Sequence, residues 1–125
     1  MKINVNPETQ ASADFGYAAE GEYKLRVVSC EWKKGKAFPY LEWKFEFADP
    51  NVKATDTTKK LGNIFENTTL KEESQFGVRN ITDALGLAWG DLDTDEVKGM
   101  ELTAKVGIEE YDGKMKNVVK KFIKA

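Results

Sequence analysis

Two short stretches of the chain combine lysines with aromatic residues, a combination that could bind unpaired nucleic acid. The first runs from Trp32 to Phe47 and reads WKKGKAFPYLEWKFEF, and the second runs from Tyr111 to Lys116 and reads YDGKMK. Lysines bind phosphates and release their counterions, and an aromatic ring that stacks on a base contributes about 1–3 kcal/mol. We therefore expect both stretches to contribute to one binding surface.

The first stretch divides between a core face and a surface face. From Tyr40 to Phe47 apolar and polar residues alternate, which is the period of a half-buried strand. We expect Leu41, Trp43, Phe45 and Phe47 to lie in the core. The candidate binding residues are the cations and rings on the other face and in the loops: Arg26, Trp32, Lys33, Lys34, Lys36, Phe38, Tyr40, Lys44, Tyr111, Lys114 and Lys116.

Each candidate also has a purely structural interpretation. Lysines in a hairpin turn commonly remain solvated and protect strand edges from aggregation. Tyr111 could equally pack at its hairpin, whereas Phe38 at the loop edge and Tyr40 on the charged face are better candidates for stacking on a base. The side that Trp32 faces depends on the Val27-Val28 pair, because a β-bulge there would turn Trp32 inward and an unbroken strand would turn it outward.

The sequence carries no catalytic signature, so we expect a protein that is not an enzyme and needs no metal or cofactor. It has no histidine, the commonest general base, and its one cysteine, Cys30, is expected to be a buried hydrophobic residue. The adjacent carboxylates of Glu72-Glu73 and Glu109-Glu110 diverge on regular elements. Residues 91–96 lack the glycine and the final glutamate of a calcium loop, so they are expected to cap a helix.

Length and composition indicate a single domain. The chain has 125 residues, of which 41% are hydrophobic and 11% aromatic, enough for one packed core. Its N-terminus lacks the pattern of a signal peptide, and no stretch is apolar enough to span a membrane. We therefore expect a cytoplasmic protein without a membrane partner.

The apolar pattern predicts five strands and one helix. Residues 22–32 and 40–47 form a first hairpin, 61–70 a third strand, and 71–85 a helix that Gly86 ends. Residues 100–108 and 115–123 form a last hairpin around Asp112-Gly113, a pair that tolerates the positive φ angles of a two-residue turn. Residues 91–98 are expected to add a helical turn. Residues 1–21 are expected to form an irregular leader, partly docked by Phe15 and Tyr17, before a single domain at 22–125.

The order strand-strand-strand-helix-strand-strand predicts an all-β fold with one helix, a five-stranded OB-type barrel. An SH3-like barrel and a small sandwich are the alternatives, and they account less well for the helix position. An OB-fold groove crosses the second and third strands between the first and last hairpin loops, here residues 33–37 and 111–116. Both hairpins are basic, with six Lys/Arg against four Asp/Glu in residues 22–47 and again in 101–125, although the formal charge of the chain is −2.

The string GEYKLRVVSCEWKKGKAFPYLEWKFEF, followed by GNIFENTTL, DALGL and KGMELTAKVGIEEYDGKMKNVVKKF, resembles a family of small phage-encoded proteins found among replication and recombination genes. The resemblance covers most of residues 20–123. It implies an OB-fold single-stranded DNA-binding protein in the host cytoplasm. Many such proteins recruit partners through an acidic C-terminal tail, whereas this chain ends in KKFIKA.

We therefore expect a non-catalytic, largely sequence-independent single-stranded DNA-binding protein of phage-type replication or recombination. Replication or recombination proteins are further expected partners, and a homo-oligomer is compatible with the sequence. One alternative is a protein-interaction module that binds such a partner through the same surface or an open strand edge. Another is an RNA-binding protein, because RNA would use the same chemistry.

Overall fold

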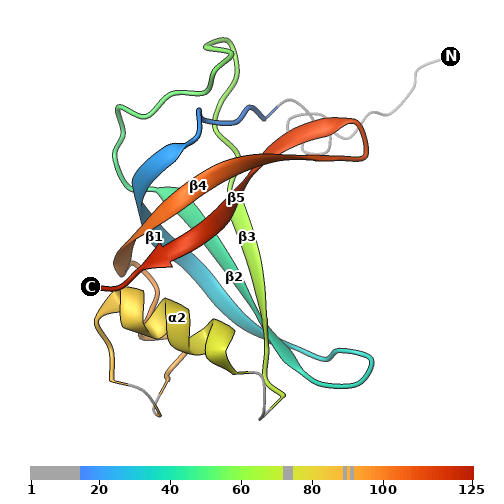
Figure 1. Cartoon of the computed structure of the whole chain (residues 1–125), viewed down its shortest axis with the longest axis vertical. Coiled ribbons are helices and arrows are strands. Elements are labelled where there is room, and N and C mark those ends of the chain that lie inside the picture. The colour runs from blue at the N-terminus through green and yellow to red at the C-terminus, as the bar shows by residue number, and fades with distance from the viewer. Residues whose placement is uncertain (1–14, 72–74, 89, 91) are drawn as a thin grey trace, which may run out of the picture.

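In the part of the chain that the structure describes, five antiparallel strands form one sheet, and one helix covers an end of it (Figure 1). The computed structural model describes residues 15–71, 75–88, 90 and 92–125, with only the backbone of Tyr111. The elements are β1 (Gly21–Lys33), β2 (Tyr40–Phe47), β3 (Ile64–Thr69), α2 (Phe76–Leu85), β4 (Glu101–Tyr111) and β5 (Lys114–Ile123). The predicted order of three strands, a helix and two strands is confirmed.

Strand β1 bends and thereby pairs with two neighbours. Its first part, Gly21–Arg26, pairs with β4, and its second part, Leu25–Lys33, pairs with β2. The pairing shifts between Val27, opposite Phe45, and Ser29, opposite Lys44, so Val28 is the extra residue of a β-bulge. The predicted bulge is confirmed, and it lets one strand serve both halves of a curved sheet.

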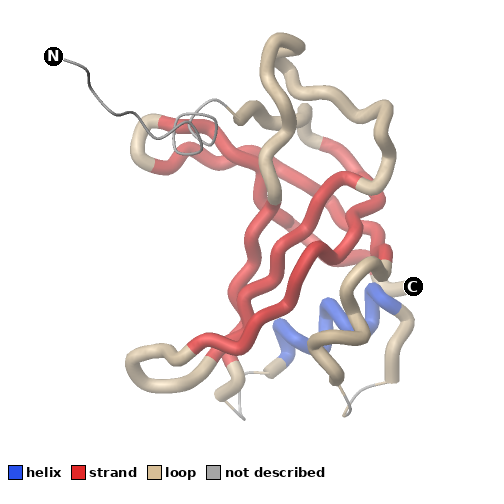
Figure 2. The backbone as a smooth tube through the Cα atoms, turned by 180° about the vertical axis from the view of Figure 1, so that it is seen from behind, coloured by secondary structure: helices blue, strands red, loops and turns tan. Residues whose placement is uncertain are grey.

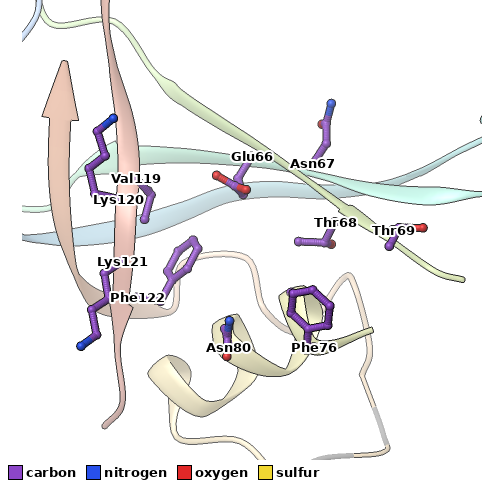
Figure 3. A pocket seen from close by; sticks show the side chains of 11 residues that line it. Glu66, Asn67, Thr68, Thr69, Phe76, Asn80, Val119, Lys120, Lys121 and Phe122 are labelled. Carbon is purple, nitrogen blue, oxygen red and sulfur yellow. The ribbon is translucent and has the colours of Figure 1, made fainter. Parts of the chain in front are cut away.

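The sheet curls without closing. Its order is β3-β2-β1-β4-β5, so β3 and β5 are the edge strands, and no ladder joins them in the described residues. Figure 2 shows the curved sheet from behind. A cleft of about 510 Å³ lies between the two edges, with Phe76 and Asn80 of α2 along one side (Figure 3). The all-β fold with its helix between the third and fourth strands is confirmed, whereas hydrogen bonds do not close the expected barrel.

The core lies on the inner face of the sheet. Leu41, Trp43 and Phe45 are buried as predicted, while Phe47 is half-buried and meets Tyr23 edge to face at 5.0 Å between ring centroids. Helix α2 adds apolar side chains, among them Val78, Ile81 and Leu85. The core also contains one buried polar pair, in which Trp43 Nε1 donates to Thr68 Oγ1 at 2.9 Å.

Cys30 is buried in this core, as predicted. Burial raises the pKa of its thiol to about 12, with a smaller contribution from the nearby Glu31 carboxylate. The side chain therefore packs as a small hydrophobic residue, because a thiolate is disfavoured at that depth.

The predicted turn signals hold at two glycines. Helix α2 ends at Gly86, which has a φ of 76° and donates its backbone N–H to the carbonyl oxygens of Asp83 and Thr82. The hairpin between β4 and β5 turns at Asp112 and Gly113, whose φ angles are 53° and 76°. Both positions need positive φ, which glycine adopts without steric cost and aspartate tolerates.

Three predicted segments differ from the structure. The helix, expected over residues 71–85, begins at Phe76. The third strand begins at Ile64 and not at residue 61, because Leu61 instead forms an isolated parallel bridge with Gly16. Residues 94–99 form turns and not the expected helical turn. There the Asp93 carboxylate accepts from the Asp95 N–H at 2.9 Å, and Gly99 donates to Val27 O at 2.8 Å, which leads the chain toward β4.

The described end of the expected leader runs along the sheet. Gly16 donates to Lys60 O at 2.7 Å, and the backbone of Ala18 bonds to the buried side chain of Asn117. Phe15 is exposed and Tyr17 is half-buried, so the docking comes from the backbone around them more than from their rings. None of the helices in the described residues has the length and apolar character needed to cross a membrane.

Candidate nucleic-acid interface

The convex side of strands β1, β2 and β3 carries the polar residues of their alternation. We call this side the outer face. Pairing across the strands arranges it in three rows: Ser29, Lys44 and Phe65; Glu31, Glu42 and Asn67; and Lys33, Tyr40 and Thr69. Residues that are directly opposite in antiparallel strands share a face. The predicted outward orientation of Tyr40 and Lys44 follows from this register.

An exposed ring with a cation above it marks one end of the outer face. Phe65 is 54% exposed although its neighbour Ile64 is fully buried. The ammonium nitrogen of Lys44 lies 5.4 Å from the centroid of the Phe65 ring. A ring that stays exposed beside a cation can stack on an unpaired base while the cation meets its phosphate.

Phe65 and Lys44 line a groove of about 980 Å³, which we call the hairpin groove. The β4–β5 hairpin forms one wall, and the N-terminal segment with the loop between β2 and β3 forms another. In Figure 2 this hairpin and the loop between β1 and β2 project on the same side of the curved sheet. The lining is Phe15, Gly16, Tyr17, Lys44, Thr55, Asp56, Lys59, Gly62, Asn63, Phe65, Asp112, Gly113, Lys114, Met115, Lys116 and Asn117.

The charge of the hairpin groove is positive on balance. Four lysines line it, against the carboxylates of Asp56 and Asp112. The pKa of Asp56 is lowered, first by the hydroxyl of Thr58 and then by the Thr58 N–H, which both donate to it. That carboxylate is therefore already bonded within its own loop. The groove suits an anion that also offers flat apolar surface, which describes a nucleotide.

The first hairpin loop lies at the other end of the outer face. Phe38 is 46% exposed, and Lys71 Nζ lies 5.0 Å from the centroid of its ring. Lys33 bonds to Glu31 at 3.1 Å, which raises the pKa of Lys33 and lowers that of Glu31. Gly35 folds against Tyr40, where a Cβ would collide with the Phe38 carbonyl oxygen. Lys34 and Lys36 are both exposed around this turn.

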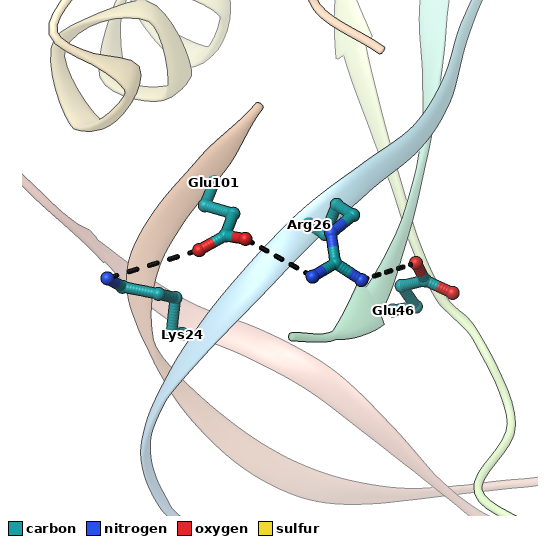
Figure 4. A network of polar contacts seen from close by, with 4 residues as sticks. All are labelled: Lys24, Arg26, Glu46 and Glu101. Carbon is teal, nitrogen blue, oxygen red and sulfur yellow. Dashed lines mark hydrogen bonds and ion pairs between the residues drawn. The ribbon is translucent and has the colours of Figure 1, made fainter. Parts of the chain in front are cut away.

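Arg26 points outward as predicted, but carboxylates engage its guanidinium. It donates to Glu46 at 3.1 Å and to Glu101 at 3.2 Å, and both bonds raise its pKa (Figure 4). Lys24 approaches the other oxygen of Glu101 at 4.0 Å. A phosphate at Arg26 would compete with these two carboxylates. The DNA-binding role of Arg26 therefore stays a prediction, and the alternative is that Arg26 only links β1 to β2 and β4.

Trp32 lies on the inner side of the sheet but outside the core. Beyond the bulge, its Cα partner is the buried Leu41, so its side chain is on the inner side of the sheet. It is nevertheless 59% exposed, because it sits at the strand end, past the last buried residue of β1, Cys30. The bulge therefore turned Trp32 inward as reasoned, yet the core does not extend far enough to cover it.

The predicted residues form two groups and some outliers. Lys44, Lys114 and Lys116 come together in the hairpin groove. Lys33, Lys34, Lys36, Phe38 and Tyr40 gather at the first hairpin loop. Arg26 and Trp32 belong to neither group. The backbone of Tyr111 pairs with Lys114 beside the groove, and its side chain lies outside the described residues.

Sequence reasoning missed Phe65, Lys59, Phe15, Tyr17 and Met115 as groove residues. Phe65 had a partial signal. Strand neighbours face opposite sides, so one of the two apolar residues Ile64 and Phe65 had to face outward. Phe15, Tyr17 and Lys59 come from loops, and Met115 comes from the start of β5. No local pattern shows that these residues meet in one groove.

The edge cleft between β3 and β5 holds one perturbed acid. Burial raises the pKa of Glu66, and the charge of Glu109 raises it further. In Figure 3 the Glu66 side chain points toward β5, whereas Asn67 points away from it. The described residues contain no group of three or more Cys, Asp or Glu side chains that could hold a metal ion.

One protein-family comparison matches this chain over residues 5–124. The matching family is described as "Protein of unknown function (DUF669)". The match spans nearly the whole chain, including every strand and the helix. The comparison with curated proteins gives no match. The family description names no ligand, so the function of the chain has to be inferred from its outer face and its hairpin groove.

Proposed function

We propose that this chain, which belongs to the DUF669 family, binds single-stranded DNA without catalysis and largely without regard to sequence. The observation that carries the proposal is the exposed Phe65 ring under Lys44, inside a groove lined by four lysines. A role in phage-type replication or recombination fits the sequence resemblance and is part of the same proposal.

The groove offers both contacts that an unpaired strand needs. Lys44, Lys59, Lys114 and Lys116 can neutralise phosphates, and Phe65 can stack on a base. Neither contact reads a base edge, so binding at this end is tolerant of sequence. A duplex would keep its bases stacked on one another, which leaves the Phe65 ring without a partner.

The outer face gives the strand a path out of the groove. Tyr40 lies four residues from Lys44 along β2, which is about 14 Å at the rise of an antiparallel strand. Beyond Tyr40 are Phe38 and the lysines of the first hairpin loop. A bound strand would therefore run from one hairpin to the other across β2 and β3.

The test is a titration of fluorescently labelled oligonucleotides at several salt concentrations. For single strands, log affinity falls with log salt at a slope of about −0.7 per neutralised phosphate, or about −3 for four groove lysines. Duplex of equal length is expected to bind more weakly. Affinity that ignored salt would refute the proposal.

A matched pair of variants distinguishes DNA binding in the hairpin groove from non-specific binding to exposed aromatic rings. Phe65→Ala removes the ring and should weaken binding about five- to a hundred-fold, the range for one stacked base. Phe76→Ala removes a ring that is 70% exposed on α2 and outside the groove, so it should leave affinity unchanged. Equal effects of the two substitutions would contradict the assignment. RNA of the same sequence, run in parallel, tests the RNA alternative.

The edge cleft favours a second candidate function, a protein-interaction module. Both β3 and β5 end the sheet, and edge strands can accept an extended peptide through backbone hydrogen bonds. Phe76, Lys120 and Lys121 line the cleft between them. A partner protein captured by the wild-type chain and lost with Phe76→Ala, together with no shift of any single strand, would favour this function over DNA binding.

A further inference from the structure

The middle of the outer face presents hydrogen-bond acceptors where both ends present cations. Glu42 on β2 pairs with Asn67 on β3. The row with Lys44 and Phe65 lies two residues away on one side, and the row with Tyr40 lies two residues away on the other, each about 7 Å distant. A strand that runs from the hairpin groove to the first hairpin loop must cross Glu42.

The Glu42 carboxylate is available to a ligand. It is half-buried, and its charge contributes to the raised pKa of Lys33. Among the described residues, the Glu42 carboxylate forms no ion pair or hydrogen bond. Lys33 instead forms an ion pair with Glu31, the residue of β1 that lies opposite Glu42. The Asn67 side chain is exposed and makes no hydrogen bond within the described part of the chain, whereas its backbone belongs to the ladder with β2. The row therefore offers two carboxylate oxygens and one amide to whatever crosses it.

The charge of Glu42 determines which part of a nucleotide can approach. An ionised carboxylate only accepts hydrogen bonds, so it repels a phosphate and attracts N–H groups. The phosphates then lie toward the lysines at either end, and a base edge faces Glu42. Single strands expose the Watson–Crick edges of their bases for such contacts.

The four bases differ in what they offer a carboxylate. Guanine presents two adjacent donors, its ring N–H and its exocyclic amino group, and cytosine and adenine each present an exocyclic amino group. Thymine presents one ring N–H between two carbonyl oxygens, which a carboxylate repels. Asn67 can donate to a ring acceptor beside an amino group, since its amide carries both functions.

We propose that Glu42, assisted by Asn67, makes the bound strand favour bases with an exocyclic amino group over thymine. The inference rests on the proposed function, since it concerns the strand that the groove and the loop would hold. The lysines and aromatic rings bind any single strand, and the row of Glu42 and Asn67 adds a modest preference for certain bases.

The experiment compares three labelled single strands of twelve nucleotides: oligo-dT, oligo-dC and alternating dT-dG. The wild-type chain is expected to bind oligo-dC and dT-dG about ten-fold more tightly than oligo-dT, the lower part of the discrimination given by a base-edge contact. Glu42→Gln should bring the three affinities together, because an amide can also donate to the thymine carbonyl oxygens. Glu96→Gln, an exposed site in the turns before β4, removes the same charge and should preserve the ten-fold ratio.

The outcomes separate the two proposals. Failure of all three strands to bind refutes the proposed function. Salt-dependent binding with equal affinity for the three strands leaves that function standing and overturns the preference. A preference that survives in Glu42→Gln also overturns it, because the discrimination would then come from other residues.

Discussion

Asn117 on β5 bonds to both polar groups of Ala18, a residue 99 positions earlier in the chain. The Ala18 N–H donates to Asn117 Oδ1 at 2.7 Å, and Asn117 Nδ2 donates to Ala18 O at 3.0 Å and to Gly107 O at 3.2 Å. The buried Asn117 side chain thus satisfies both backbone groups of Ala18, as a neighbouring strand would do. Because that segment forms a wall of the hairpin groove, Asn117 links the stability of the sheet to the shape of the groove.

Replacing Asn117 with Ala should therefore destabilise the protein by about 1–3 kcal/mol, the cost of leaving buried polar groups unpaired. Urea denaturation measures this change in the free energy of unfolding. Hydrogen exchange at the Ala18 amide should quicken in the variant. Asn51→Ala, in the exposed loop after β2, is the matched control and should change neither quantity. A variant as stable as the wild type would show that the segment is held by other contacts.

Charge reversal of groove lysines should weaken binding and flatten its salt dependence. Lys114→Glu with Lys116→Glu removes two expected phosphate contacts, which lowers the magnitude of the salt slope by about 1.4. The triple reversal at Lys33, Lys34 and Lys36 tests the first hairpin loop in the same way.

The control for the double variant is Lys53→Glu with Lys124→Glu, which changes net charge equally at exposed positions outside the groove. It should leave the slope near the wild-type value. If a folded variant with Lys114→Glu and Lys116→Glu bound DNA as tightly as the wild type, the β4–β5 hairpin would not be part of the binding site.

Cys30 should resist thiol reagents as long as the protein is folded. Thiolates react and thiols do not, and the folded pKa of about 12 leaves almost no thiolate at pH 8. In the unfolded chain the pKa returns to about 8.5, so labelling in denaturant should reach one group per chain. Since the folded pKa is raised, the stability associated with the thiol is present below pH about 8.5 and is lost as pH rises toward the folded value. Rapid complete labelling without denaturant would contradict the burial of Cys30.

Glu66 should make the protein slightly less stable when it ionises. Burial and Glu109 raise its pKa in the folded state, so its contribution favours folding at low pH and is lost as pH rises through the folded pKa. Glu66→Gln should therefore raise the melting temperature at pH 7 and change it little near pH 4. The comparison variant is Glu96→Gln, an exposed carboxylate, and it should show no such pH-dependent gain. A Glu66→Gln variant that melts lower at pH 7 would show that the carboxylate has a stabilising partner.

Local patterns predicted those parts of the fold that local physics determines. Alternation placed Trp43 and Phe45 in the core, and positive φ explains the turn at Gly113. The adjacent valines at 27 and 28 predicted the bulge. These features depend on neighbours in the sequence, so they can be inferred without knowledge of the long-range pairing.

The rest depends on residues that meet only after folding. Arg26 was correctly expected to point outward, but Glu46 and Glu101 reach it from two other strands. Phe65 follows Ile64, and pairing of Ile64 with Phe45 decides which of the two apolar neighbours is buried. One groove wall is the predicted last hairpin, but the other comes from residues 15–17 and 55–63, whose positions no local period indicates.

The double pairing of β1 has a consequence for the order in which the chain can fold during synthesis. The part of β1 that pairs with β2 finds its partner a few residues later, so the first hairpin can form as soon as it leaves the ribosome. The other part must wait for β4, since 75 residues separate Arg26 from Glu101. Until β4 is made, the apolar side chains of Leu25 and Val27 stay more exposed than in the folded protein. Exposed apolar surface of this kind is prone to aggregate. The last hairpin therefore both completes the candidate groove and ends the exposure of the core.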